Sequence, residues 1–208
     1  MTTHARTASV SAAVCALFAV GLSGCGGGDG AVRGADEEND FVRAVEEMTG
    51  GESVEPVDFR ALKELLPETV AGWQRIEHEG QRSAAAGFTV SNASALYQPE
   101  SGGYTTINIE ITDTGGLGGV AGMGMAAWLS MDVDRETDDG YERTTEYDGH
   151  PAYESFQARD GEIGSAQLNI VVEKRFIVQL SGADVSMEAV KNAAAQLDLD
   201  RLADLADE

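Results

Sequence analysis

The chain has 208 residues and a formal net charge of −22 at pH 7, with 14 basic and 36 acidic residues. So acidic a surface repels phosphates and anionic lipid headgroups, which argues against nucleic-acid binding and against direct adsorption to a membrane. The two cysteines, Cys15 and Cys25, lie within the first 25 residues, so an internal disulfide in the remainder of the chain is excluded.

The N-terminus has the layout of a secretory signal peptide. Arg6 lies in a short cationic start without acids, and a mainly apolar run without charged residues follows over residues 8–22. This run is shorter than the roughly 20 residues that cross a bilayer comfortably. We therefore expect residues 1–24 to be a cleaved signal peptide and the protein to be exported.

The sequence Leu22-Ser23-Gly24-Cys25 resembles the lipobox of bacterial lipoproteins. The resemblance implies cleavage before Cys25 and attachment of fatty chains, such as palmitate, at its thiol. The expected partner is then a membrane, which the protein contacts through its lipid anchor in the cell envelope. Gly26, where an aspartate would retain such proteins in the inner membrane, implies the outer membrane, facing the periplasm, if the source has two membranes.

Residues 25–56 are rich in Gly and in acids and carry few large apolar side chains. Such a segment buries too little surface to fold, and predicts a flexible tether with an r.m.s. reach of about 30 Å. Residues 57–208 form the expected globular domain. It begins with a short helix, for which Asp58 is a cap and Pro67 a stop.

Alternating apolar residues predict the strands of this domain. Segments 73–79 and 87–97 are the first two, and the clearest follows, with Ile107, Ile109 and Ile111 on one face. Gly turns separate four further segments, which are 141–147, 152–158, 166–173 and 176–180, with a tight turn expected at Lys174-Arg175. Such alternation is typical of antiparallel sheets with one covered face.

Helical spacing of apolar residues predicts helices over residues 120–131 and 187–197 and a last short helix from Leu199 to Leu205. Asp184 or Ser186 is the expected cap of the second, and Gly182 the expected end of the sheet. The predicted fold is therefore α+β, a mainly antiparallel sheet of about six strands covered by helices in a single domain. This order resembles the fold of the PsbP and Mog1 group, which implies a module that binds or assists another protein.

The glycine-rich segment 115–119 lies between a strand and a predicted helix. The spacing Gly116-x-Gly118-x-x-Ala121 matches part of a dinucleotide-binding fingerprint, but that fingerprint requires a parallel βαβ unit, which the hairpins contradict. The glycines fit a sharp turn better, and a partner-binding lip is an alternative. No cofactor is therefore expected.

Alternating carboxylates of Asp132, Asp134, Glu136 and Asp138 resemble the start of a calcium loop. Thr137 replaces the glycine of an EF-hand, and Arg143 replaces its bidentate glutamate, so we expect a solvated acidic loop and no metal site. Periplasmic ligand or calcium binding through residues 132–142 is the alternative function.

Catalytic constellations are missing from the sequence. His78 and His150 are the histidines beyond the signal peptide, and neither has a partner at metal-ligand spacing or a nucleophile elbow nearby. We expect a non-catalytic, membrane-anchored envelope lipoprotein that binds a protein or an envelope polymer, with no catalytic residue. An uncharacterised hydrolase is the third possibility.

Overall fold

A single large sheet dominates the structure, a computed structural model that describes residues 54–85, 88–115 and 130–207. Nine strands in these ranges form one sheet in the order β1-β2-β3-β4-β9-β8-β7-β6-β5, and every neighbouring pair is antiparallel. The strands are β1 (Thr69–Val70), β2 (Trp73–Ala85), β3 (Phe88–Gln98), β4 (Thr106–Asp113), β5 (Asp134–Thr137), β6 (Gly140–Tyr147), β7 (His150–Asp160), β8 (Ile163–Val172) and β9 (Phe176–Val185).

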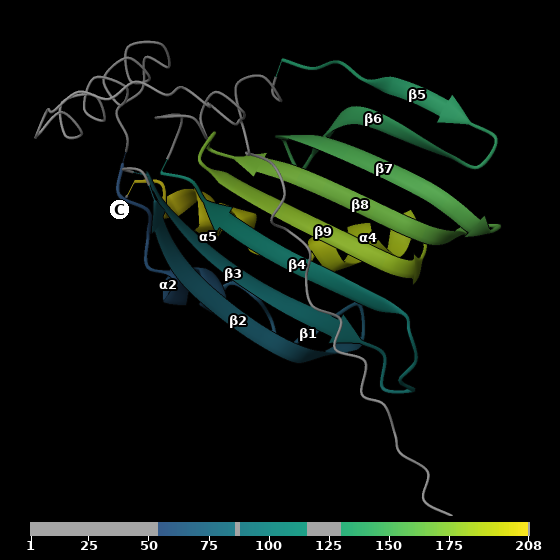
Figure 1. Ribbon diagram of the computed structural model, residues 1–208, viewed down its shortest axis with the longest axis horizontal. Coiled ribbons are helices and arrows are strands. Elements are labelled where there is room, and N and C mark those ends of the chain that lie inside the picture. Colours follow the sequence, from purple (N-terminus) through teal and green to yellow (C-terminus); the bar gives the residue numbers. More distant parts are fainter. Residues whose placement is uncertain (1–53, 86–87, 116–129, 208) are drawn as a thin grey trace, which may run out of the picture. The chain divides into compact units, whose positions relative to one another are not determined.

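Two meanders meet at the centre of the sheet (Figure 1). Strands β1 to β4 follow one another from one edge inward, and β5 to β9 do so from the other edge. The two halves join where β4 pairs with β9, residue by residue from Thr106 opposite Ala183 to Asp113 opposite Phe176. Sheet neighbours in the middle are thus about 70 residues apart in sequence.

Three short helices cover one face of the sheet. They are α2 (Phe59–Glu64), which contacts β2 and β3, α4 (Met187–Ala194), which contacts β8 and β9, and α5 (Leu199–Asp204), which contacts β8. In Figure 1 they lie behind the strands. In the described part of the chain no helix is long and apolar enough to span a membrane.

Strand alternation builds the core between the sheet and these helices. In β4 the residues alternate strictly between half-buried and buried, as the sequence predicts, with Ile107, Ile109 and Ile111 buried. Leu168 of β8 and Leu180 of β9 lie in the same apolar cluster. The opposite side of these strands carries mostly polar residues, with Val171 and Ile177 as apolar exceptions.

The predicted fold class is wrong. The structure is β-rich, with nine strands in place of about six, and the described helices lie on a single face and are short. Two of the strands, β1 and β5, were not expected, because they are too short or too charged to give an alternating apolar pattern. The strand expected over 73–79 is present as β2 and continues to Ala85. The helix expected over residues 120–131 lies largely outside the described residues.

Two glycines inside strands allow the helices to approach the sheet. A Cβ atom at Gly80 would lie 2.6 Å from Cδ2 of Phe59 in α2, and one at Gly182 would lie 2.9 Å from Cγ2 of Val190 in α4. Gly182 was expected to end the sheet, but β9 continues to Val185. The glycine is therefore a site of close helix-to-sheet contact and not a chain break.

The helix caps follow the sequence. The Asp58 side chain accepts a hydrogen bond from the backbone N–H of Arg60 at 2.8 Å, and Ser186 Oγ accepts one from Ala189 N–H at 3.2 Å. Ser186, and not Asp184, is thus the cap of α4. Both predictions of a helix start are confirmed.

A buried ion pair fastens one end of the sheet. Arg175, at the start of β9, donates from Nη2 to Asp113 Oδ2 at 3.0 Å and from Nε to Asp113 Oδ1 at 3.1 Å, and both side chains are almost fully buried. The same guanidinium donates to the carbonyls of Glu55 and Ala206, and Asp113 accepts from Val57 N–H at 2.9 Å. The first and last described segments are therefore held to the sheet through one pair of charges.

The turn predicted at Lys174-Arg175 lies one residue earlier in the structure. Within this turn, Glu173 (51°) and Lys174 (52°) have positive φ, so these two residues form the centre of the hairpin turn. Arg175 points inward and is 5% exposed. Sequence alone does not distinguish a buried, paired arginine from an exposed turn arginine.

Burial of Tyr97 makes the folded state less stable at alkaline pH. Its ring is fully buried, its hydroxyl donates to the Pro67 carbonyl at 2.8 Å, and burial raises the pKa of Tyr97 from 10.0 to about 12. As the pH rises, Tyr97 ionises in the unfolded chain before it ionises in the folded one. Its contribution to the free energy of unfolding is therefore complete below pH 10 and is lost as the pH rises to 12. We expect the loss to approach 2 to 3 kcal/mol, roughly, in the free energy of unfolding.

Urea denaturation at pH values from 8 to 11.5 measures this loss. Tyr97→Phe should be less stable at pH 8, by about 1 kcal/mol for the lost hydrogen bond, and should decline less steeply above pH 10. The other tyrosines titrate in both proteins and so cancel. Equal slopes in the two proteins would contradict the assignment to Tyr97.

Candidate functional site

The face of the sheet opposite the helices carries a grid of polar side chains. Its twelve members lie in three rows across β4, β9, β8 and β7, and we call this grid the open face. The rows are Glu110, Gln179, Asn169 and Tyr153; Asn108, Ser181, Gln167 and Ser155; and Thr106, Ala183, Ser165 and Gln157. All are half-buried or exposed. Neighbours in a row lie on adjacent strands, about 4.8 Å apart.

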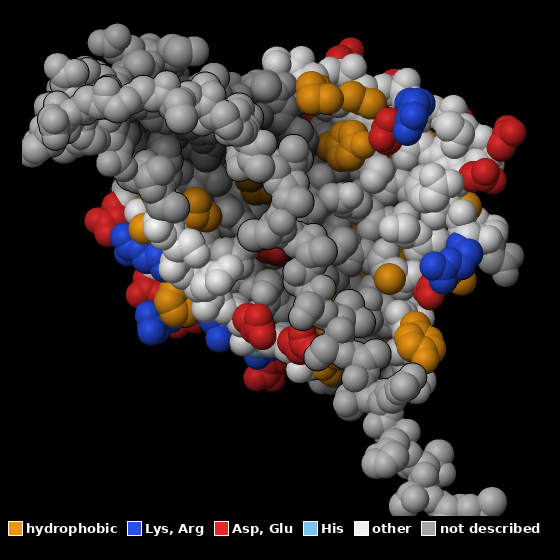
Figure 2. Space-filling model, viewed as in Figure 1, with side chains coloured by type: hydrophobic (Ala, Val, Ile, Leu, Met, Phe, Trp, Pro, Cys, Tyr) orange, Lys and Arg blue, Asp and Glu red, His pale blue; other side chains and the backbone are white. Residues whose placement is uncertain are grey.

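The open face is nearly uncharged, although acids far outnumber bases in the chain. Glu110 is its one charged residue, and amides and hydroxyls make up most of the rest. Figure 2 views this side, where most of the acidic and basic side chains that can be seen lie toward the rim. Amide groups both donate and accept hydrogen bonds, so the surface is suited to an uncharged ligand rich in hydroxyl groups.

Hydrogen bonds order several of these side chains. Asn92 of β3 donates from Nδ2 to Glu110 Oε1 at 2.5 Å and to Thr112 Oγ1 at 3.0 Å. In the centre, Gln167 Nε2 donates to Asn169 Oδ1 at 3.4 Å. The grid is thus partly preorganised, which lowers the entropic cost of binding a ligand.

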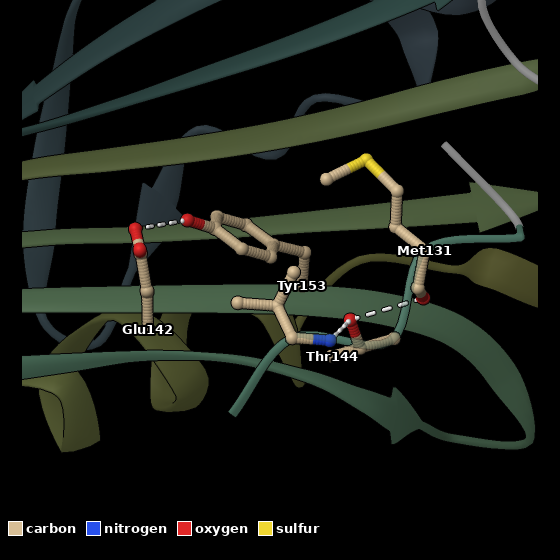
Figure 3. Close-up of a pocket in the computed structure, with 5 residues that line it drawn as sticks. Met131, Glu142, Thr144 and Tyr153 are labelled. Atoms are coloured by element: carbon tan, nitrogen blue, oxygen red, sulfur yellow. Dashed lines mark hydrogen bonds between the residues drawn. The ribbon is translucent and has the colours of Figure 1, made fainter. Parts of the chain in front are cut away.

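Glu142 of β6 extends the middle row beyond β7. It lies opposite Ser155, and its own partner on β5 is Arg135. Arg135 Nε is 2.7 Å from Glu142 Oε1, and the Tyr153 hydroxyl donates to Glu142 Oε2 at 2.9 Å. Figure 3 shows the tyrosine hydroxyl directed at this carboxylate.

Two pockets adjoin Glu142. The first, of about 270 Å³, is lined by Met131, Val133, Glu142, Thr144 and Tyr153. The second, of about 220 Å³, is more polar, and its walls include Arg135, Glu142, Ser155, Gln157 and Gln167. Glu142 lines both, so the two pockets adjoin at this residue, at the β5 end of the sheet.

Burial raises the pKa of Tyr153, and its hydrogen bond to Glu142 raises it further. The phenol is therefore neutral at physiological pH and is held as a donor to the carboxylate. Because its one proton is donated to Glu142, the phenol oxygen and the carboxylate are both acceptors for the hydroxyl groups of a ligand.

The predicted acidic segment does not form a compact site. Asp134 and Glu136 lie on strand β5, opposite Arg143 and Tyr141, while Asp132 and Asp138 lie beyond its ends. All four are exposed. Among residues 54–85, 88–115 and 130–207, no three His, Cys, Asp or Glu side chains come together as metal ligands.

The remaining predicted residues lie elsewhere. Leu22, Ser23, Gly24 and Cys25 fall outside the described residues, as does the segment Gly116 to Ala121. His78 Nε2 is 3.1 Å from the Lys63 carbonyl, between β2 and α2, and burial lowers its pKa. His150 begins β7, opposite Tyr147.

Sequence reasoning predicted all four strands of the open face, but it assigned a polar face only to β4. The polar positions of β4 were expected to face solvent, and they do. In β8 and β9 the corresponding signal is present as Gln167 and Asn169, and as Gln179 and Ser181, each alternating with apolar residues. The register that aligns them cannot be read from the sequence.

Comparisons with known proteins found no counterpart. No protein family, no curated protein and no solved structure matches this chain. The resemblances to bacterial lipoproteins and to the PsbP and Mog1 group therefore stay predictions.

Proposed function

We propose that this protein is a lipoprotein of the cell envelope, anchored through Cys25, whose sheet domain is a non-catalytic module that binds a neutral envelope polysaccharide. The observation that carries the ligand class is the open face, an array of amides and hydroxyls with one charged member on a strongly acidic protein.

The anchor rests on the lipobox and the tether. Acyl chains at Cys25 would supply the membrane attachment that an acidic surface cannot. Residues 26–53 would then separate the domain from the headgroups by an r.m.s. distance of about 30 Å. If the source has two membranes, Gly26 favours the outer one, with the domain in the periplasm.

The chemistry of the open face favours a neutral polysaccharide over other polymers. Nucleic acids and acidic glycans would be repelled by the net charge of −22. Protein interfaces are centred on aromatic or arginine anchors in apolar pockets, whereas the grid has one aromatic residue, Tyr153. An uncharged glycan offers hydroxyl groups that the amides of Gln167, Asn169 and Gln179 can both donate to and accept from.

The anchor is tested by mass spectrometry of the mature N-terminus and by detergent phase partitioning of the full-length chain. We expect acylated Cys25 as the first residue and recovery in the detergent phase. Cys25→Ser should move the protein to the aqueous phase. An unmodified thiol in the native protein would overturn the anchor.

The ligand class is tested by affinity electrophoresis of the mature chain carrying Cys25→Ser. The gels contain laminarin, galactomannan, dextran or hydroxyethyl cellulose, with alginate as the anionic comparison. We expect at least one neutral polymer to retard the protein, and Gln167→Ala combined with Gln179→Ala to weaken binding by about tenfold or more. The matched control is Gln196→Ala, an exposed glutamine after α4.

Two results would contradict the proposal. One is mobility that none of the neutral polymers changes. The other is specific photocrosslinking of a single protein through a reactive amino acid at position 179, because this would make the open face a protein interface.

A further inference from the structure

Building on the binding function above, we propose that Glu142 is shared by two adjoining sugar subsites at the β5 end of the open face. The two pockets on either side of its carboxylate would each hold one sugar unit of a neutral glycan chain. Glu142 and the residues that line these pockets would then contribute most to affinity and to the choice among neutral glycans.

The carboxylate has acceptor capacity to spare. Glu142 Oε2 accepts from the Tyr153 hydroxyl at 2.9 Å, and Oε1 lies 2.7 Å from Arg135 Nε. A carboxylate offers about four lone-pair positions, so both oxygens can still accept from ligand hydroxyl groups. The side chain is 29% exposed, which leaves it accessible.

The two pockets differ in a way that suits a sugar ring. Met131, Val133 and the Tyr153 ring give the first pocket apolar walls, and Thr144 adds a hydroxyl (Figure 3). A pyranose has apolar C–H surfaces and a polar equator of hydroxyl groups. Its C–H surface fits against the apolar walls while its hydroxyl groups reach Glu142.

The second pocket connects this site to the grid. Among its walls are Ser155, Gln157 and Gln167, which are members of the open face, together with Arg135. The middle row runs Asn108, Ser181, Gln167, Ser155 and then Glu142 across adjacent strands. The first pocket lies on the row of Tyr153 and Thr144, and the second lies on the rows of Ser155 and Gln157, so a glycan that fills both would run along β6 and β7 past Glu142.

Arg135 and Tyr153 hold the Glu142 carboxylate in place and leave it able to accept hydrogen bonds from a ligand. Arg135 is 67% exposed, so its ion pair contributes little to stability. Arg135 lines the second pocket and Tyr153 lines the first, so the Glu142 carboxylate is held by one partner from each pocket. Held in place, the carboxylate loses little entropy when a ligand binds.

The test is isothermal titration of the mature chain carrying Cys25→Ser with the hexasaccharides laminarihexaose, mannohexaose, maltohexaose and cellohexaose. We expect Glu142→Gln to weaken binding of the preferred hexasaccharide by about tenfold or more, and Tyr153→Phe to weaken it severalfold. The control Glu136→Gln makes the same charge change on β5, at a residue that lines neither pocket. It should bind like the parent protein.

Thermal melting of each variant separates binding from folding. Glu142→Gln should melt close to the parent protein, because the side chain lies at the surface. Parent-like binding by folded Glu142→Gln would overturn the subsites, while reduced binding by the Gln167 and Gln179 variant in the same titration would leave the proposed function standing. A parent protein that binds none of the neutral polysaccharides or hexasaccharides would overturn both.

Discussion

Replacing Arg175 by alanine is expected to lower the free energy of unfolding by about 3 to 5 kcal/mol, because it leaves Asp113 buried and unpaired. The arginine also donates to the carbonyls of Glu55 and Ala206, so its loss releases both ends of the domain from the sheet. Equilibrium urea denaturation measures the change as a fall in the midpoint at constant slope. Few other single changes in this domain are expected to cost as much.

The control is Arg159→Ala, which breaks an exposed ion pair with Asp184 at 2.5 Å. Exposed pairs contribute about 0 to 1 kcal/mol, so this variant should denature almost like the parent protein. If Arg175→Ala and Arg159→Ala proved equally mild, the Asp113 pair would not be buried as the structure has it. Asp113→Asn is a second check, since it keeps the size and some hydrogen bonds but removes the charge.

The sequence predicts the strands in which apolar and polar residues alternate strongly, and it does not predict those without such alternation. Ile107, Ile109 and Ile111 identify β4 without ambiguity. In contrast, β5 consists of Asp134 to Thr137, which are all exposed, and its strand structure comes from pairing with β6. Pairing partners override local preference in such edge strands.

Glycine and arginine each misled the prediction for one physical reason. Gly182 resembles a strand end by composition, yet the strand needs a glycine there because α4 lies against it. Arg175 resembles a turn residue, yet its partner Asp113 lies 62 positions away in the chain. Both contacts are tertiary, so neither is visible in a local pattern.

The candidate site was beyond sequence reasoning for a similar reason. Its rows combine β4 with β9, whose residues are far apart in the chain, and a one-residue change of register would turn every side chain to the other face. Alternation shows that Gln167 and Gln179 point away from the core, but not that they lie near Asn108. Likewise, Glu142 and Tyr153 meet only because β6 pairs with β7.

The roles of the two faces of the sheet can be distinguished by substitutions at neighbouring positions of one strand. Leu180 of β9 is fully buried within the apolar core, and Gln179 next to it lies on the open face. Leu180→Ala should lower the free energy of unfolding by about 2 to 5 kcal/mol, from lost burial and from the cavity that remains. Gln179→Ala should change it by about 0.5 kcal/mol or less.

Binding should follow the opposite order. Measured with the polysaccharide that retards the parent protein, and at a temperature where Leu180→Ala is still folded, Gln179→Ala should bind more weakly while Leu180→Ala binds like the parent. The reason is that the Gln179 amide lies on the proposed binding face, whereas the Leu180 side chain is buried in the core on the other side of the sheet. Weak binding by folded Leu180→Ala together with full binding by Gln179→Ala would place the ligand on the helix-covered side, and the open face would then lose its proposed role.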